Sequence, residues 1–139
     1  MEQIKTMNVD KERLRKICKK SNLNLVILFG SHATKKGIKK ESDIDIGILY
    51  KKVENIVKND LRLTQAFIKV LGNDRVDLIY LNYADPLLLF EMAKNGILLY
   101  QDKEDRFAEF KIKAIKRHLD AEKFYKLEDL CLERFLQNK

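Results

Sequence analysis

The pattern of apolar and polar positions predicts helices and strands that alternate along the chain. Apolar residues at helical spacing indicate helices at about residues 9–20 and 54–71. Four short, largely apolar runs are typical of strands: 23–30 (LNLVILFG), 42–50 (SDIDIGILY), 75–82 (RVDLIYLN) and 97–100 (ILLY). This order predicts an α+β fold in which helices flank a small mixed β-sheet.

Capping residues mark further helices. Asp85 is suited to an N-cap, Pro86 follows at the first helical position, and Gly96 comes after the expected end. A short helix is expected at residues 31–36, directly after Gly30. From about residue 102 onward, apolar positions at helical spacing predict helices almost to the end of the chain.

The whole chain, residues 1–139, has the length of one domain, with a predicted core at about 22–101 and C-terminal helices at about 102–137. Hydrophobic residues make up 45% and charged residues 35%, which excludes a disordered chain and a membrane protein. No apolar run approaches the roughly 18 residues that cross a bilayer, and the first residues lack the apolar centre of a signal peptide. We therefore expect a cytoplasmic protein.

Charge and cysteines add little by themselves. The formal charge of +7 favours a phosphate-bearing partner, but the lysines are scattered, with the densest group between Lys35 and Lys40. Direct binding of nucleic acid is therefore left open. Cys18 and Cys131 lack the spacing of a zinc or redox motif, so both are expected to be buried, reduced thiols.

Aspartates within two predicted strands are the main candidates for chemistry. Because side chains alternate along a strand, Asp43 and Asp45 project from the same face, and Asp77 lies on another strand. Two carboxylates about 4 Å apart repel each other by about 4 kcal/mol at an effective dielectric near 20. A hard divalent cation would offset this repulsion. Any one of these aspartates alone is more simply read as a solvated strand end or turn residue.

A possible phosphate cradle precedes these aspartates. Gly30 and Ser31 follow a predicted buried strand and open a predicted helix, where backbone N–H groups and the helix dipole can receive a phosphate. A Gly-Ser pair alone usually marks an ordinary turn. Its position just before the paired aspartates favours the phosphate-binding interpretation.

Gly30, Ser31, Asp43, Asp45 and Asp77 together resemble the motifs of the nucleotidyltransferases of the DNA polymerase beta superfamily. Within this superfamily, the closer resemblance is to the minimal nucleotidyltransferase (MNT) antitoxins. It includes the stretch from RVDLIYLN to GILLY and the helical tail, so it covers nearly the whole chain. Eleven residues separate Ser31 from Asp43, one more than the commonest family spacing. Such an insertion in a surface turn costs little, although it leaves the effect on the loop's shape open.

The resemblance implies a fold, a reaction and a partner. It implies a polymerase beta-like nucleotidyltransferase fold in which Asp43, Asp45 and Asp77 bind two Mg²⁺ ions, while Gly30 and Ser31 hold the phosphates of ATP. Asp77 would also help to remove the acceptor's proton. MNT antitoxins pair with a HEPN ribonuclease toxin and transfer AMP to one of its tyrosines, which makes this the leading hypothesis. Nucleotide preference, the acceptor residue, the number of AMP units and the stoichiometry stay open.

Two alternatives stay open as well. The chain could be a small nucleotidyltransferase that acts on RNA ends or on a small substrate, or an antitoxin that neutralises its partner by binding alone. Neither histidine is expected to be catalytic: His32 is read as exposed and His118 as structural or interfacial. Tyr80, Tyr83 and Tyr100 could stack on a base, but tyrosines at strand ends more often fill the edge of a core.

Overall fold

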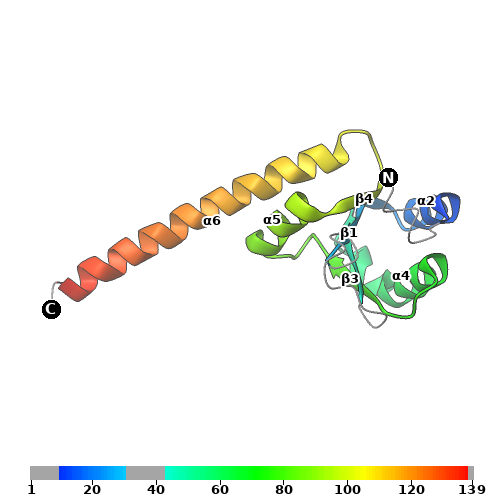
Figure 1. The fold of residues 1–139 in the computed structure, drawn as a ribbon, viewed down its shortest axis with the longest axis horizontal. Coiled ribbons are helices and arrows are strands. Elements are labelled where there is room, and N and C mark those ends of the chain that lie inside the picture. Colours follow the sequence, from blue (N-terminus) through cyan, green and yellow to red (C-terminus); the bar gives the residue numbers. More distant parts are fainter. Residues whose placement is uncertain (1–9, 31–42, 138–139) are drawn as a thin grey trace.

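The computed structural model describes residues 10–30 and 43–137, which form a four-stranded mixed sheet between two layers of helices (Figure 1). The strands are β1 (Leu23–Phe29), β2 (Ile44–Tyr50), β3 (Val76–Tyr80) and β4 (Ile97–Gln101), in the spatial order β3-β2-β1-β4. The central strand β1 is antiparallel to β2 and β4, whereas β2 and β3 run parallel. The predicted α+β class and all four predicted strands are confirmed.

Two pairs of helices cover the two faces of the sheet. The helices α2 (Lys11–Lys20) and α4 (Asn55–Leu71) lie on one face, and α5 (Pro86–Asn95) and α6 (Arg106–Gln137) lie on the other (Figure 1). The alternation of β2 divides its side chains between the two layers, because Ile44, Ile46 and Ile48 pack toward α2 and α4. Gly47 points the other way, and a Cβ there would touch Leu81 and Met92.

Local sequence explains where these helices begin and end. The Asp10 carboxylate accepts the backbone N–H groups of Glu12 and Arg13 at the start of α2. The Asp85 carboxylate accepts the N–H of Leu88 at 2.9 Å, and Pro86 opens α5, as predicted. Gly72 ends α4 in the left-handed conformation, which glycine adopts without steric cost.

The C-terminal part is one continuous helix instead of the several helices that we predicted. No glycine or proline interrupts the 32 residues of α6, so the helix runs for about 48 Å. Its first half packs against α5, and its second half projects away from the sheet (Figure 1). No described helix, α6 included, combines the length and the apolarity needed to span a membrane.

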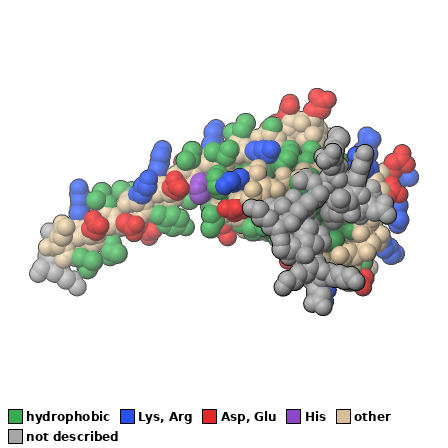
Figure 2. Space-filling view, in the orientation of Figure 1, with side chains coloured by type: hydrophobic (Ala, Val, Ile, Leu, Met, Phe, Trp, Pro, Cys, Tyr) green, Lys and Arg blue, Asp and Glu red, His purple; other side chains and the backbone are tan. Residues whose placement is uncertain are grey.

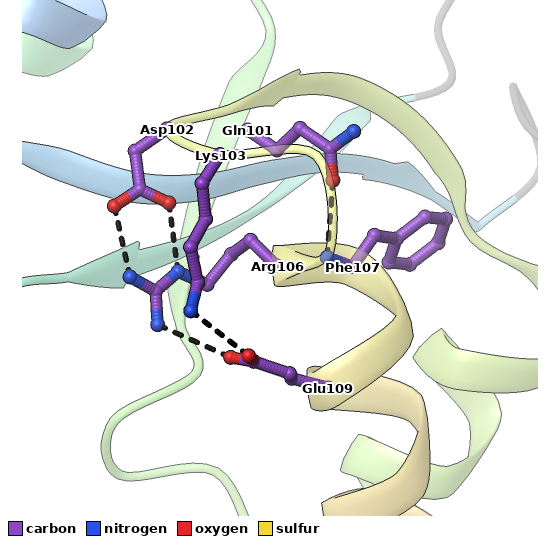
Figure 3. A network of polar contacts seen from close by, with 6 residues as sticks. All are labelled: Gln101, Asp102, Lys103, Arg106, Phe107 and Glu109. Atoms are coloured by element: carbon purple, nitrogen blue, oxygen red, sulfur yellow. Dashed lines mark hydrogen bonds and ion pairs between the residues drawn. The ribbon is translucent and has the colours of Figure 1, made fainter.

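Polar contacts fix the start of α6 beside β4 (Figure 3). The Arg106 guanidinium donates to both carboxylate oxygens of Asp102, at 2.7 and 2.9 Å. The Gln101 side-chain carbonyl accepts the backbone N–H of Phe107 at 3.1 Å, and Lys103 donates to Glu109 at 2.9 Å. The Gln101 bond satisfies a backbone N–H of the first turn that has no partner within the helix, and the other two contacts join side chains across the start of α6.

Two other predictions have different outcomes. The short helix expected at residues 31–36 lies outside the described residues, as do the lysine group, His32 and Ser31. Cys18 is buried as predicted, but the prediction for Cys131 is wrong because its side chain is exposed. The reason is that the second half of α6, which carries Cys131, projects beyond the helices and strands of the described residues (Figure 1).

Candidate active site

Two of the predicted aspartates are brought together by strand pairing. Asp45 on β2 and Asp77 on β3 occupy paired positions in the parallel register. Paired residues of neighbouring strands project from the same face of a sheet, so both carboxylates point toward the α5 and α6 layer. Asp45 is half-buried and Asp77 is exposed, which leaves this edge of the sheet open to solvent.

Gly30 lies against the carboxylate of Asp45 at the end of β1. It follows Phe29, which pairs with Asp45 across the antiparallel ladder, and its φ is +80°. A Cβ built on Gly30 would overlap Oδ2 of Asp45. The positive φ favours glycine at this corner, and a larger residue would also have to displace the Asp45 carboxylate.

Asp43 directly precedes β2 and is exposed. The alternation of β2, carried back to this residue, puts it on the same side as Asp45. Among the described residues, no three histidine, cysteine or acidic side chains stand close enough together to hold a metal ion as they lie. The backbone thus brings Asp45 and Asp77 together, whereas the three aspartates do not form a metal-binding group as their side chains lie.

This edge of the sheet presents oxygen ligands of the kind that hard cations prefer. Two carboxylates in paired positions destabilise each other when both are ionised, and a divalent cation would remove that cost. The donor set of Asp43, Asp45 and Asp77 therefore fits Mg²⁺ in its chemistry. The role of these residues as ligands, and of Gly30 and Ser31 in nucleotide binding, stays a prediction.

A comparison with known families identifies the arrangement. The model of the family described as "Polymerase beta, Nucleotidyltransferase" matches residues 12–105, which contain all four strands and the three aspartates. The chain belongs to this nucleotidyltransferase family. The family resemblance seen in the sequence is confirmed, and membership means that the reaction transfers a nucleotidyl group.

Individual relatives are similar over most of the chain. The "Protein adenylyltransferase MntA" of Aphanizomenon flos-aquae (strain 2012/KM1/D3) is 29% identical over 132 residues, which cover 89% of this chain and 87% of the relative. A toxin–antitoxin crystal structure with AMP-PNP matches with a TM-score of 0.65 and 27% identity, covering 88% of this chain and 99% of the matched chain.

A second solved structure is also a complex of a toxin with an antitoxin. It contains a tri-AMPylated HEPN toxin of Shewanella oneidensis in complex with an MNT antitoxin, and the match has a TM-score of 0.57 and 27% identity. It covers 87% of this chain and 95% of the matched chain. These likenesses cover a larger share of the chain than the family model and reach into α6.

Other candidate residues of the nucleotidyltransferase have structural roles. The His118 ring stacks on Phe90 with 4.0 Å between ring centroids, and its Nε2 lies 3.2 Å from Glu122, which confirms the structural reading. The Tyr80 hydroxyl donates to the carboxylate of Asp60 on α4. Burial raises the pKa of Tyr100, which lies on the α2 and α4 face, away from Asp45.

Sequence reasoning missed a hollow on the same face as the aspartates. It has a volume of about 220 Å³ and lies between α6, α5 and the far ends of β2 and β3, with Arg106, Lys113 and Arg117 along its α6 side. Leu49, also in its lining, is four residues from Asp45, or about 13 Å along the strand. The near-helical spacing of these three cations in the sequence could have indicated that they share one side of α6. Only the packing of α6 reveals that they line a hollow.

Proposed function

We propose that the chain is a Mg²⁺-dependent antitoxin that transfers AMP from ATP to a tyrosine of a cognate HEPN ribonuclease toxin. The observation that carries the proposal is the pairing of Asp45 with Asp77 beside the Gly30 corner, in a chain of the nucleotidyltransferase family. Two relatives of similar length support this choice of donor and acceptor. One is a protein adenylyltransferase, and the other is an antitoxin bound to an AMPylated toxin.

The proposed reaction is an in-line displacement at the α-phosphorus of ATP. The tyrosine oxygen forms a bond to this phosphorus, the bond to the β-phosphate bridging oxygen breaks, and pyrophosphate leaves. The phenol proton passes to the Asp77 carboxylate, directly or through water. Gly30 allows the phosphates to approach the backbone closely, and Ser31 would donate its hydroxyl to them.

Asp43, Asp45 and Asp77 would hold Mg²⁺, which supplies positive charge where charge develops on the phosphates. Two ions are the proposed number, with Asp43 and Asp45 shared between them. Without the cation, the paired carboxylates would repel the triphosphate as well as each other. Transfer should therefore require a divalent cation and stop when EDTA is added.

We propose that a partner protein brings the acceptor, as the structural relative with an AMPylated HEPN toxin suggests. The second half of α6 exposes seven large apolar side chains, which we call the α6 tail surface: Phe124, Tyr125, Leu127, Leu130, Leu132, Phe135 and Leu136. Phe124 is 60% and Phe135 is 64% exposed, and the space-filling view shows hydrophobic side chains along the projecting helix (Figure 2). Exposed apolar side chains gathered on one helix segment are typical of protein interaction sites, so we assign this surface to the toxin.

The deciding experiment mixes the purified chain, its co-expressed HEPN-like partner, Mg²⁺ and one nucleoside triphosphate at a time. Intact mass spectrometry should detect added AMP units on the partner with ATP, and none after Asp45→Asn with Asp77→Asn. If the double variant still binds and neutralises the partner, the antitoxin acts by binding alone. If RNA gains nucleotide while the partner does not, the RNA-end alternative replaces the proposal.

The α6 tail surface is tested separately by Phe124→Ser with Leu132→Ser. We expect the toxin to stop co-eluting with this variant in size-exclusion chromatography, while Lys126→Ser with Arg134→Ser on the same helix leaves the complex intact. Assignment to the toxin is wrong if the apolar variant keeps the complex. A change in self-association alone would show that a second copy covers this surface.

A further inference from the structure

A basic groove lies between α2 and α4, on the face of the sheet opposite the aspartates. We call it the α2–α4 groove. The two helices contact each other along this face (Figure 1). A hollow of about 400 Å³ between them is lined by Arg13, Lys16, Ile17, Arg62, Gln65, Ala66 and Lys69. A smaller adjoining hollow shares Ile17, Arg62 and Ala66 and adds Lys20.

The cations form two facing rows. Arg13, Lys16 and Lys20 lie on α2 at the spacing i, i+3, i+7, which places them on one side of that helix. Arg62 and Lys69 lie seven residues apart on α4, also on one side. At a rise of 1.5 Å per residue, each row is about 10.5 Å long. Both walls of the groove therefore carry positive charge over the same length.

These charges are not balanced by the described part of the protein. No aspartate or glutamate lines either hollow, and none of the five cations forms an ion pair with a described carboxylate. Arg62 donates to the Asn59 side-chain oxygen, at 3.3 Å. Like charges that face each other disfavour the packing of two helices. A polyanion in the groove would reverse this unfavourable term.

We propose that the α2–α4 groove binds the phosphate backbone of a single-stranded nucleic acid. A row of about 10.5 Å spans about three phosphates at the 3.4 Å axial spacing of a strand in a B-form helix, and fewer when a single strand is extended. A two-walled groove suits a strand better than a flat membrane surface, because both rows can contact one backbone. None of the described residues that line the groove is aromatic, so binding depends on phosphate contacts and is insensitive to base sequence.

The position of the groove keeps this binding separate from nucleotidyl transfer. The α2 and α4 layer packs on the side chains of Ile44, Ile46 and Ile48, whereas Asp45 projects to the opposite face. A strand in the groove therefore leaves the Asp45 and Gly30 corner uncovered. The inference goes beyond the proposed function, and it stands even if the acceptor of the nucleotide is not a toxin.

The test measures fluorescence anisotropy of labelled mixed-sequence RNA and DNA oligonucleotides of about 12 nucleotides, a length within known single-strand site sizes. The full-length chain should bind both, and log Kobs should fall with log salt with a slope up to about −3.5 for five engaged cations. Lys16→Glu with Arg62→Glu should weaken binding at least tenfold and reduce the slope by about 1.4. Circular dichroism and transfer activity check that this variant is folded. If the charge reversal unfolds the chain, Lys16→Gln with Arg62→Gln replaces it in the binding measurement.

The matched control is Lys116→Glu with Lys123→Glu, which changes the formal charge equally on exposed positions of α6. It should weaken binding less than twofold. The proposal is overturned if both double variants weaken binding equally, because net charge alone would then explain it. It is also overturned if the chain fails to bind the oligonucleotides at 50 mM salt. Binding to anionic lipid vesicles or inorganic pyrophosphate alone would count as such a failure.

Discussion

Asp45 on β2 and Asp77 on β3 lie directly opposite each other, paired in the parallel register of an otherwise apolar part of the sheet. The neighbouring pairs, Ile44 with Val76 and Ile46 with Leu78, pack into the core on the other face. Opposed like charges weaken a sheet by about 0.2–1 kcal/mol. Their placement is therefore unfavourable for folding and favourable for binding a cation, as expected where stability is given up for function.

Removing the charge of Asp77 should separate the effect of the pair on cation binding from its effect on folding stability. Asp77→Asn is expected to reduce AMP transfer at least about 100-fold, because the carboxylate both binds the cation and accepts the proton. In EDTA the same change should leave the melting temperature unchanged or raise it slightly, because the repulsion with Asp45 is removed. Asp74→Asn, an exposed position just before β3, is the control and should change neither quantity. A transfer rate close to wild type in Asp77→Asn would remove Asp77 from the site.

Two glycines with positive φ allow the role of the Gly30 corner to be isolated. Gly30 has φ +80° and its added Cβ would overlap Oδ2 of Asp45, whereas Gly72 has φ +64° and no atom within 4 Å of its added Cβ. Each Gly→Ala change should cost about 1–2 kcal/mol in the free energy of unfolding through backbone strain. Only Gly30→Ala should also abolish transfer and weaken ATP binding, measured by calorimetry. Equal transfer by the two variants would contradict a role for the corner.

The sequence predicted the elements around Asp45 and Asp77 because local patterns encode them. Continuous apolar runs marked the buried strands, and Asp85 with Pro86 marked the start of α5. The family motif then indicated which strand aspartates belong together. Strand order and the pairing of Asp45 with Asp77 depend on tertiary contacts, so the sequence alone gave no register for them.

Features that depend on which helices meet were not predicted. The α2–α4 groove forms where two helices pack together, and it brings Lys16 and Arg62, 46 positions apart in the sequence, into the lining of one hollow. The exposure of Cys131 follows from the projection of α6 beyond α5, which its apolar spacing does not reveal. An apolar helical stripe has the same pattern whether it packs on its own chain or on a partner.

The two cysteines should differ sharply in reactivity. Burial raises the pKa of the Cys18 thiol to about 12 and removes it from solvent, whereas Cys131 is exposed. Iodoacetamide at pH 8 should therefore add one group to the native chain and a second only in denaturant, as read by intact mass. Cys131→Ser should remove the fast modification completely. Two additions at similar rates in the native chain would show that the core around Cys18 opens readily.

The Asp102 and Arg106 pair should make stability depend on pH at the start of α6 (Figure 3). The hydrogen bonds from Arg106 lower the pKa of Asp102, so the folded state binds this proton less readily than the unfolded state. The resulting stabilisation is present above the unfolded pKa and is lost as pH falls through the folded pKa. Asp102→Asn should cost about 0.5–1 kcal/mol in urea unfolding at pH 7, and the difference from wild type should shrink toward zero near pH 2. Glu104→Gln, an exposed neighbour, should show no such pH-dependent difference. A cost for Asp102→Asn that stays constant down to the lowest pH would mean that the lost contacts do not depend on the charge of Asp102.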